Sequence, residues 1–140
     1  MKYIIFIWLL LIGQHLYPQT VKLSITVNHL KVTNGVVFIS LYNEEKSFPI
    51  DGKEFRKVAV KPLSLSVSYT YDNLQPGEYA VAIFHDQNGD GICNLGLLGI
   101  PKEGFGFSRN FKPKLKAPEF DDCSLVVNKD MTLVIDLIFR

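Results

Sequence analysis

After its first dozen residues the chain lacks any apolar run long enough to cross a membrane, which takes about 20 residues as a helix. The one apolar block, Ile4–Ile12, is about half that length and follows a single basic residue, Lys2. This layout is typical of a secretory signal peptide. We therefore expect residues 1–19 to be a signal peptide and residues 20–140 to form one domain, secreted or held in the periplasm or cell envelope. An uncleaved N-terminal anchor is the alternative.

The chain also lacks an excess of charge of either sign. It has 15 basic and 14 acidic residues, and loss of Lys2 with the signal peptide would balance them. The one basic run, Arg109–Lys116, is followed at once by acidic residues at 119, 121 and 122. A neutral domain has no electrostatic attraction for a polyanion, so no nucleic-acid partner is expected.

Cysteine is scarce, with only Cys93 and Cys123. In an oxidising compartment the two could form a disulfide, which would close a loop of about 30 residues and add about 3–4 kcal/mol of stability. They could equally be free thiols, because sequence cannot show that their Cβ atoms meet. Their spacing does not fit a structural zinc site.

No window has a helical period, whereas alternation of apolar and polar residues recurs along the chain. We expect seven or so strands, and Asn34-Gly35 is a strong hairpin signal between the first two. The pattern predicts an all-β chain, a single immunoglobulin-like or prealbumin-like β-sandwich, with a small barrel as the competitor. The expected strands are 21–27, 36–42, 55–60, 65–71, 79–84, 120–127 and 132–139.

A long connection, Asp86–Pro118, holds six glycines and three prolines. Loops of this length are usually functional or contain an unrecognised element. The segment Gly104–Phe107 alternates glycine with phenylalanine and could be a short extra strand. Its aromatic rings could form a stacking surface for a sugar or peptide. The interpretation we favour is that they plug one end of the sandwich.

The acidic turn at the start of this connection could hold a cation. Side-chain oxygens recur at alternate positions, and glycine permits the sharp turn that calcium loops need. A carboxylate is missing at the twelfth position, where Leu97 stands, so the expected site is weak unless Glu103, Asp121 or Asp122 adds a ligand. The alternative is an ordinary turn capped by its own side chains. The predicted Ca²⁺ ligands are Asp86, Asn88, Asp90, Ile92 and Asn94.

A catalytic apparatus is not recognisable. His85 lies beside Asp86, but neighbours on a strand point to opposite faces, and no serine or cysteine stands in a nucleophile elbow. An enzyme or enzyme accessory built on His85, Asp86 and Glu103 remains an alternative that would need these side chains to converge. A small-ligand carrier that uses the sandwich interior is another, although abundant large apolar residues favour a filled core.

Two stretches, Gly77–Gly91 and Gly99–Ser108, resemble the exported bacterial proteins of the domain of unknown function 2141 family. The resemblance implies a bacterial, exported protein and implies no activity. Asn94 stands where relatives often have aspartate, which would weaken a metal site. Leu74–Tyr79 also resembles the turn into a strand of prealbumin-like modules. The leading hypothesis is a non-catalytic sandwich with a calcium-binding turn and a loop face for a macromolecular or glycan partner at the cell envelope.

Overall fold

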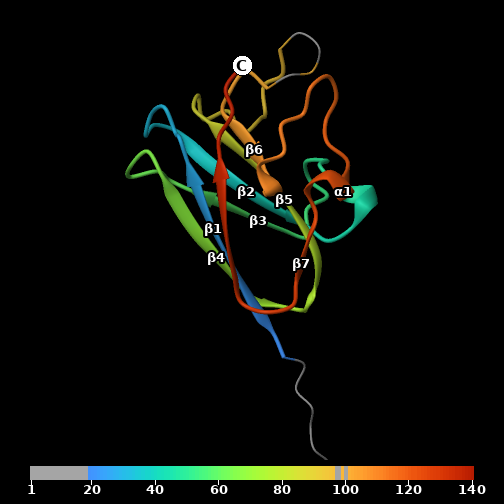
Figure 1. Cartoon of the computed structure of the whole chain (residues 1–140). Coiled ribbons are helices and arrows are strands. Elements are labelled where there is room, and N and C mark those ends of the chain that lie inside the picture. The colour runs from blue at the N-terminus through green and yellow to red at the C-terminus, as the bar shows by residue number, and fades with distance from the viewer. Residues whose placement is uncertain (1–18, 97–98, 100) are drawn as a thin grey trace, which may run out of the picture.

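The computed structural model describes residues 19–96, 99 and 101–140, so residues 1–18 of the expected signal peptide and the twelfth loop position, Leu97, lie outside the described residues. Two β-sheets pack face to face, as Figure 1 shows. In chain order the elements are β1 Val21–Asn28, β2 Val36–Tyr42, η1 Glu45–Ser47, β3 Arg56–Val60, β4 Val67–Leu74, β5 Gly77–Asp86, β6 Phe105–Phe107, η3 Ser108–Asn110, α1 Phe120–Cys123, β7 Leu125–Val127 and β8 Met131–Asp136.

The fold is the expected all-β sandwich. One sheet has the strand order β4-β1-β8, and the other has the order β3-β2-β5-β6, with β7 also paired to β5. Strands β1 and β8 run parallel, and the other pairs are antiparallel. Among the described residues, no helix is long and apolar enough to span a membrane.

The core lies between the two sheets and is filled by the alternate residues of the strands. Leu23, Ile25 and Val27 point inward from β1 and are fully buried. They pack with residues of the other sheet such as Ile39. Across the core the Tyr71 hydroxyl donates to the Ile39 carbonyl oxygen at 2.6 Å. Burial of such side chains is the main source of the fold's stability.

The hairpin predicted at Asn34-Gly35 is wrong. Strand β1 pairs with β4 and β8, whereas β2 pairs with β3 and β5, so this turn carries the chain from one sheet to the other. Asn-Gly favours a tight turn, but it does not decide which strands pair. The turn instead contacts the end of β5: Asn34 Nδ2 donates to the Gln87 carbonyl oxygen at 2.9 Å.

The strand predicted over 120–127 is also partly wrong, because its first four residues form the single helical turn α1. A reciprocal capping box holds this turn: the Glu119 side chain accepts from the Asp122 backbone N–H, and Asp122 Oδ2 accepts from the Glu119 N–H. Each such bond satisfies a donor that the first helical turn leaves free. Strand β7 follows. The predicted extra strand at 104–107 is confirmed as β6.

Candidate functional site

The five-stranded sheet is apolar on its outer face as well as its inner face. Residues paired across neighbouring strands share a face. The outward set therefore follows from the register: Ser40 pairs with Ala82, which pairs with Phe107, and Phe84 pairs with Phe105. Strand β5 is largely buried on both faces, and the cover on its outer face comes from loops rather than from a third sheet.

Part of this outer face is closed by a second, smaller apolar cluster. It contains Tyr42, Phe48, Ala80, Phe120 and Cys123, all buried. Phe48 meets the Tyr42, Phe107 and Phe120 rings edge-on, with centroids 5.2–6.1 Å apart. The helix α1 therefore packs against the lower part of the outer face, beside β5 in Figure 1.

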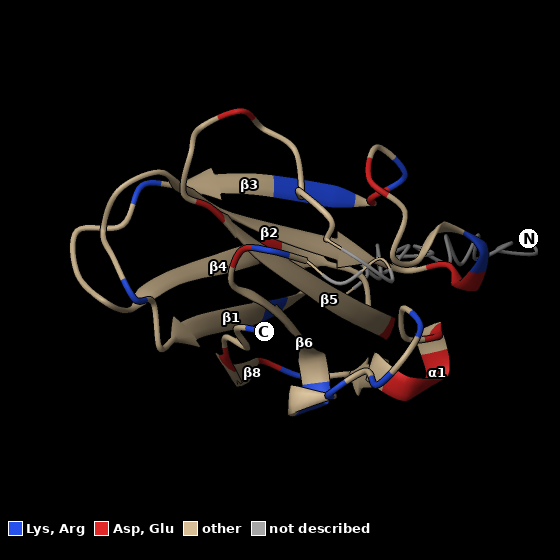
Figure 2. Cartoon of the chain, turned by 90° about the horizontal axis from the view of Figure 1, so that it is seen from above, with Lys and Arg blue, Asp and Glu red and all other residues tan. Residues whose placement is uncertain are grey.

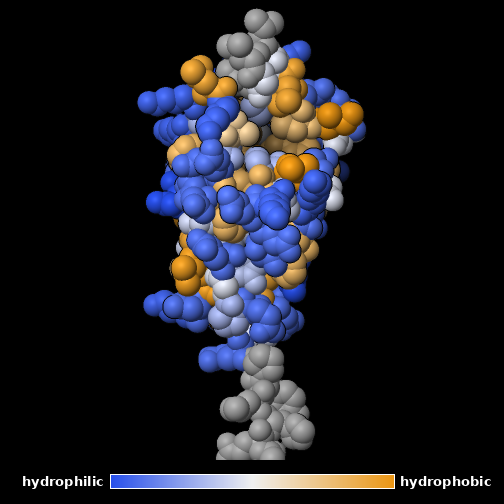
Figure 3. All heavy atoms as spheres, turned by 90° about the vertical axis from the view of Figure 1, so that its right-hand side faces the viewer, coloured by the Kyte–Doolittle hydropathy of each residue, from blue (hydrophilic) through white to orange (hydrophobic). Residues whose placement is uncertain are grey.

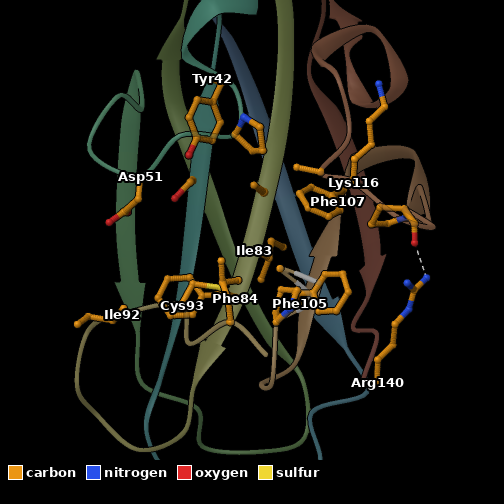
Figure 4. A pocket seen from close by; sticks show the side chains of 18 of the residues that line it. Tyr42, Asp51, Ile83, Phe84, Ile92, Cys93, Phe105, Phe107, Lys116 and Arg140 are labelled. Carbon is orange, nitrogen blue, oxygen red and sulfur yellow. Dashed lines mark hydrogen bonds between the residues drawn. The ribbon is translucent and has the colours of Figure 1, made fainter. Parts of the chain in front are cut away.

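The rest of the outer face is the floor of an open cavity of about 490 Å³. This volume lies in the range of small-molecule sites. Its floor consists of the outward-facing residues Ser40, Ala82, Phe84 and Phe107. Figure 4 labels the two phenylalanines. Two loops form its walls. One contributes Ile92, Cys93, Leu95, Gly99 and Pro101, and the other contributes Pro113, Lys114, Leu115, Lys116 and Ala117.

Exposed apolar side chains border the cavity. Ile92 is 62% exposed, Leu95 56% and Leu115 82%. Scattered surface hydrophobics need no explanation, but apolar residues gathered at one hollow mark an interaction site. Figure 3 shows this face of the molecule, with apolar atoms around a hollow in its upper half.

The charges at the cavity are unevenly distributed. Asp51 lies on one side and forms an ion pair with Lys57. Lys116 and Arg140 lie on the other side (Figure 4). Lys114, from the same loop as Lys116, also lines the cavity. Over the whole described chain, by contrast, basic and acidic residues occur in short separate groups, such as the basic pair on β3 and the acidic pair on α1 (Figure 2).

The interpretation that Phe105 and Phe107 plug one end of the sandwich is wrong. Both rings line the outer cavity, and it is the glycines that face the other layer. A Cβ on Gly106 would lie 2.9 Å from Ile135 Cγ2, and one on Gly104 would lie 2.6 Å from the Phe139 ring. Glycine at both positions lets the C-terminal segment pack closely against β6 and the residue before it.

The acidic turn is closed by hydrogen bonds to the Asp86 carboxylate. Asp86 is buried at the end of β5. Its Oδ1 accepts from the Gly89 N–H and its Oδ2 from the Gly91 N–H, both at 2.8 Å. These two bonds fold the chain back over β5 in the manner of an Asx turn.

The other predicted calcium ligands are gathered in the same turn. Asn88 Oδ1 accepts from the Asp90 N–H at 3.0 Å, and Asp90 Oδ1 accepts from the Ile92 N–H at 2.8 Å. Asn94 Nδ2 donates to Asp90 Oδ2 at 2.7 Å and to the Ile92 carbonyl oxygen at 3.3 Å. The hydrogen bond from Asn94 is the main reason that the pKa of Asp90 is lowered.

Glu103 is the extra carboxylate that reaches this turn. Its Oε1 accepts from the Gln87 N–H at 2.7 Å, while its Oε2 is buried without a hydrogen-bond partner. Asp121 and Asp122 lie on α1 instead. Among the described residues, no three His, Cys, Asp or Glu side chains are grouped as a metal site. A cation at the turn would therefore depend on amide and carbonyl oxygens beside Asp86 and Asp90.

His85 and Asp86 have separate partners. His85 is fully buried on the inner side of β5, and its Nε2 is bonded to the Asn34 carbonyl oxygen at 2.8 Å. Its Nδ1 has no hydrogen-bond partner. Asp86 is bound to the turn amides, and Glu103 contacts Gln87. None of the three forms a hydrogen bond with another.

Cys93 and Cys123 are free thiols in this structure. Cys93 is half-buried in the cavity wall, whereas Cys123 is buried in the outer cluster. Burial raises the pKa of both thiols, that of Cys123 to about 12. Alkylation of Cys93 is therefore slow at neutral pH and faster in alkaline solution, where more thiolate forms.

Sequence reasoning missed the cavity itself. Its walls come from two segments that are separate in the sequence, and Arg140 joins one of them by donating to the carbonyl oxygens of Pro113 and Lys114. The alternation Phe105-Gly106-Phe107 was a visible signal, but its faces could be assigned only once β6 was seen to pair with β5.

Comparison with known proteins identifies a family and no activity. The model of the family described as "Uncharacterized protein conserved in bacteria (DUF2141)" matches residues 25–134. The chain belongs to this family, as its motifs indicated. No curated protein and no solved structure matches the chain.

Proposed function

We propose that this member of an uncharacterised bacterial family is an exported, non-catalytic binding protein that holds a ligand in the cavity on the outer face of its five-stranded sheet. The observation that carries the proposal is the cavity of about 490 Å³, which has an apolar floor and an exposed apolar rim. Rigid strands form the floor and loops form the walls, which is the usual construction of a binding site. The sandwich interior, by contrast, is packed with side chains.

The buried position of His85 supports binding rather than catalysis. A general base must come within hydrogen-bond reach of a substrate proton. His85 has no exposed surface and is bonded to the Asn34 carbonyl, while Asp86 holds two backbone amides. The alternative of an enzyme built on His85, Asp86 and Glu103 would require this end of β5 to open.

The lining favours an apolar ligand over the glycan that the leading hypothesis from the sequence included beside a macromolecular partner. The rings of Phe84 and Phe107 could stack on a sugar, but the polar side chains of the floor are few, chiefly Ser40 and Tyr42. The Tyr42 hydroxyl already donates to the Ile50 carbonyl oxygen at 3.3 Å. Sugars need many hydrogen bonds to replace those they lose to water.

The cavity can be blocked from its floor. Ala82→Trp would place an indole over the floor, and we expect it to weaken binding of the fluorescent probe 1-anilinonaphthalene-8-sulfonate by about tenfold or more, since a tenfold change needs only about 1.4 kcal/mol. Ala59→Trp is the matched control. Ala59 is exposed on the same face of the sheet, on β3, and does not line the cavity. Fluorescence titration of the two variants and the wild type measures the difference.

Equal affinity of all three proteins would contradict the proposal. Because the probe also binds partly unfolded chains, thermal unfolding of each variant is recorded first. If Ala82→Trp proves unstable, Leu115→Asp is used instead. It changes the exposed rim and is expected to weaken binding of the probe without changing the fold.

We also propose that calcium holds the acidic turn and through it the loop that forms one cavity wall. The oxygens of Asp86, Asn88 and Asp90 supply the ligand types that calcium prefers, and each carboxylate oxygen bonded to an amide retains a second lone pair. A half-rotation of the Asn94 amide would add its oxygen. Glu103 contacts this turn because its Oε1 accepts from the Gln87 N–H, and its Oε2 is buried without a hydrogen-bond partner.

Calcium is therefore expected to raise the melting temperature of the exported protein. A site with a Kd near 1 mM would contribute about 1.4 kcal/mol at about 10 mM Ca²⁺, which corresponds to roughly 5 °C. Scans with calcium, magnesium and chelator measure the shift. Asp90→Ala should abolish it, while Asp72→Ala, which removes an exposed carboxylate from β4 on the other sheet, should preserve it. The same melting temperature in calcium and in chelator would contradict calcium binding and show that only the turn's own hydrogen bonds hold it.

A further inference from the structure

The cavity has an apolar floor and one cationic wall, a combination that selects a particular ligand chemistry. We propose that its ligand is a free single-chain carboxylate amphiphile, a fatty acid anion, with the chain over Ala82, Phe84 and Phe107 and the carboxylate at Lys114. This inference rests on the proposed function and specifies the ligand class for the same cavity.

The floor and rim fit a flexible hydrocarbon chain. Ala82 is the small side chain of the floor, next to Phe84 on the same face of β5 and paired with Phe107 on β6. Ile92 and Leu115, on opposite walls, are 62% and 82% exposed to water. A chain that lay between the walls would remove both side chains and its own methylene groups from water, and each buried methylene contributes about 0.8 kcal/mol.

Lys114 and Arg140 are the cavity-lining cations without a carboxylate partner among the described residues, and the Arg140 guanidinium already donates to two carbonyl oxygens. We therefore assign the ligand carboxylate to Lys114. Lys116 pairs with Glu119, and Asp51 on the far side pairs with Lys57. Arg140 donates to the carbonyl oxygens of Pro113 and Lys114, which ties the chain on either side of the Lys114 Cα to the C-terminal segment. Lys114 itself has no carboxylate within ion-pair distance among the described residues. An anionic head at this wall would meet a positive charge at the edge of water, where little desolvation is required.

The shape of the site favours a free chain over a membrane surface. A surface that docks on a bilayer presents its apolar residues on a convex or flat face. Here the exposed Ile92 and Leu115 belong to the two loops that form the walls of a hollow, and the apolar floor lies on the sheet between those loops. A single chain can reach this floor, whereas a bilayer would contact only the rim.

Cys93 provides a direct measure of occupancy. Its thiol lies in the cavity wall, whereas Cys123 is buried in the separate cluster closed by α1. Alkylation by iodoacetamide at mildly alkaline pH, followed by mass spectrometry, should add one group to the native protein. A ligand in the cavity should slow that addition.

The test compares octanoate, decanoate and dodecanoate, below their micelle concentrations, with decanol as the neutral analogue. We expect the dissociation constant measured from Cys93 protection to fall about fourfold for each added methylene, until the hydrocarbon chain covers the floor. Lys114→Glu should weaken protection by decanoate about five- to tenfold and leave decanol unchanged. Lys112→Glu is the matched control, because Lys112 is exposed on the same loop and does not line the cavity.

Two results would overturn this inference and leave the proposed function standing. One is binding of the fluorescent probe, blocked by Ala82→Trp, without protection by any fatty acid. The other is equal protection by decanoate and decanol with no effect of Lys114→Glu. Protection of Cys93 only by vesicles of anionic phospholipid would show that the cavity binds a membrane surface and not a free fatty acid. If neither the probe nor a fatty acid protects Cys93, the proposed function fails as well.

Discussion

Replacement of Gly35 by alanine is expected to destabilise the protein by about 3–5 kcal/mol, because backbone strain and overpacking add at this position. Gly35 has a φ of +80°, where a side chain is strained. A Cβ would also lie 2.7 Å from Gln87 Cα and 2.9 Å from the Asp86 carbonyl carbon, and closer still to the Asp86 carbonyl oxygen. Backbone atoms cannot move aside as a flexible side chain can.

Gly52→Ala separates the two causes. Gly52 has a φ of +81°, nearly the same as that of Gly35, but a Cβ there would meet nothing within 4 Å. We expect Gly52→Ala to lower the free energy of unfolding by about 1 kcal/mol, through conformational strain alone. Denaturant unfolding of both variants gives the difference. Equal losses would show that the close approach of Gly35 to β5 does not matter for stability.

Asp86→Ala is the second variant with a large expected effect, about 2–4 kcal/mol of lost stability when measured in chelator. The buried carboxylate accepts two backbone N–H groups at 2.8 Å. Hydrogen bonds to a charged acceptor contribute about 1.5–3 kcal/mol each, and water can partly replace them at the exposed glycines. Asp86→Asn keeps one acceptor oxygen and should lose roughly half as much.

Asp130→Ala is the control for this variant, because it removes a carboxylate that accepts a backbone hydrogen bond at an exposed position. Asp130 Oδ1 accepts from the Lys22 N–H at 2.9 Å, in a turn that remains open to water. Asp130→Ala should therefore cost much less than Asp86→Ala. Asp86→Ala should also accelerate Cys93 alkylation, because Cys93 follows the turn that Asp86 closes. A stable variant with unchanged alkylation would show that the turn does not hold the cavity wall.

The strand pattern could be predicted from the sequence because it is local. Alternation in β1 places Leu23, Ile25 and Val27 on one face, and that face is the core. The turn into β5 was equally visible: the Tyr79 hydroxyl donates back to the Gln75 carbonyl oxygen at 2.8 Å, which fixes the chain as it enters the strand. Such signals use neighbouring residues and need no knowledge of sheet order.

Sheet membership could not be predicted in the same way. Asn34-Gly35 marks a turn whether or not the flanking strands pair, and here β1 pairs with β8 from the far end of the chain. The helix α1 was missed because one turn shows no helical period, although Glu119 and Asp122 had the spacing of a capping box. The wrong placement of Phe105 and Phe107 had the same cause, since the two faces of β6 depend on its pairing with β5.

The same distinction between local and long-range signals applies to the candidate site. The turn from Asp86 to Asn94 was recognisable from its side-chain types, and the structure brings those side chains together. The cavity was not recognisable, because it needs two loops and the C-terminal Arg140 to meet over β5. Long-range assembly of this kind leaves little trace in a single sequence.

Chemical-shift mapping tests the central claim most directly. Amide spectra of residues 20–140, titrated with 1-anilinonaphthalene-8-sulfonate, report every residue near the probe. We predict that the largest shifts fall on Ser40, Ala82, Phe84, Cys93 and Phe107, the residues of the cavity floor and wall. Shifts concentrated on the exposed face of β4, around Ser68 and Thr70, or spread through the core would contradict the assignment of the outer cavity as the binding site.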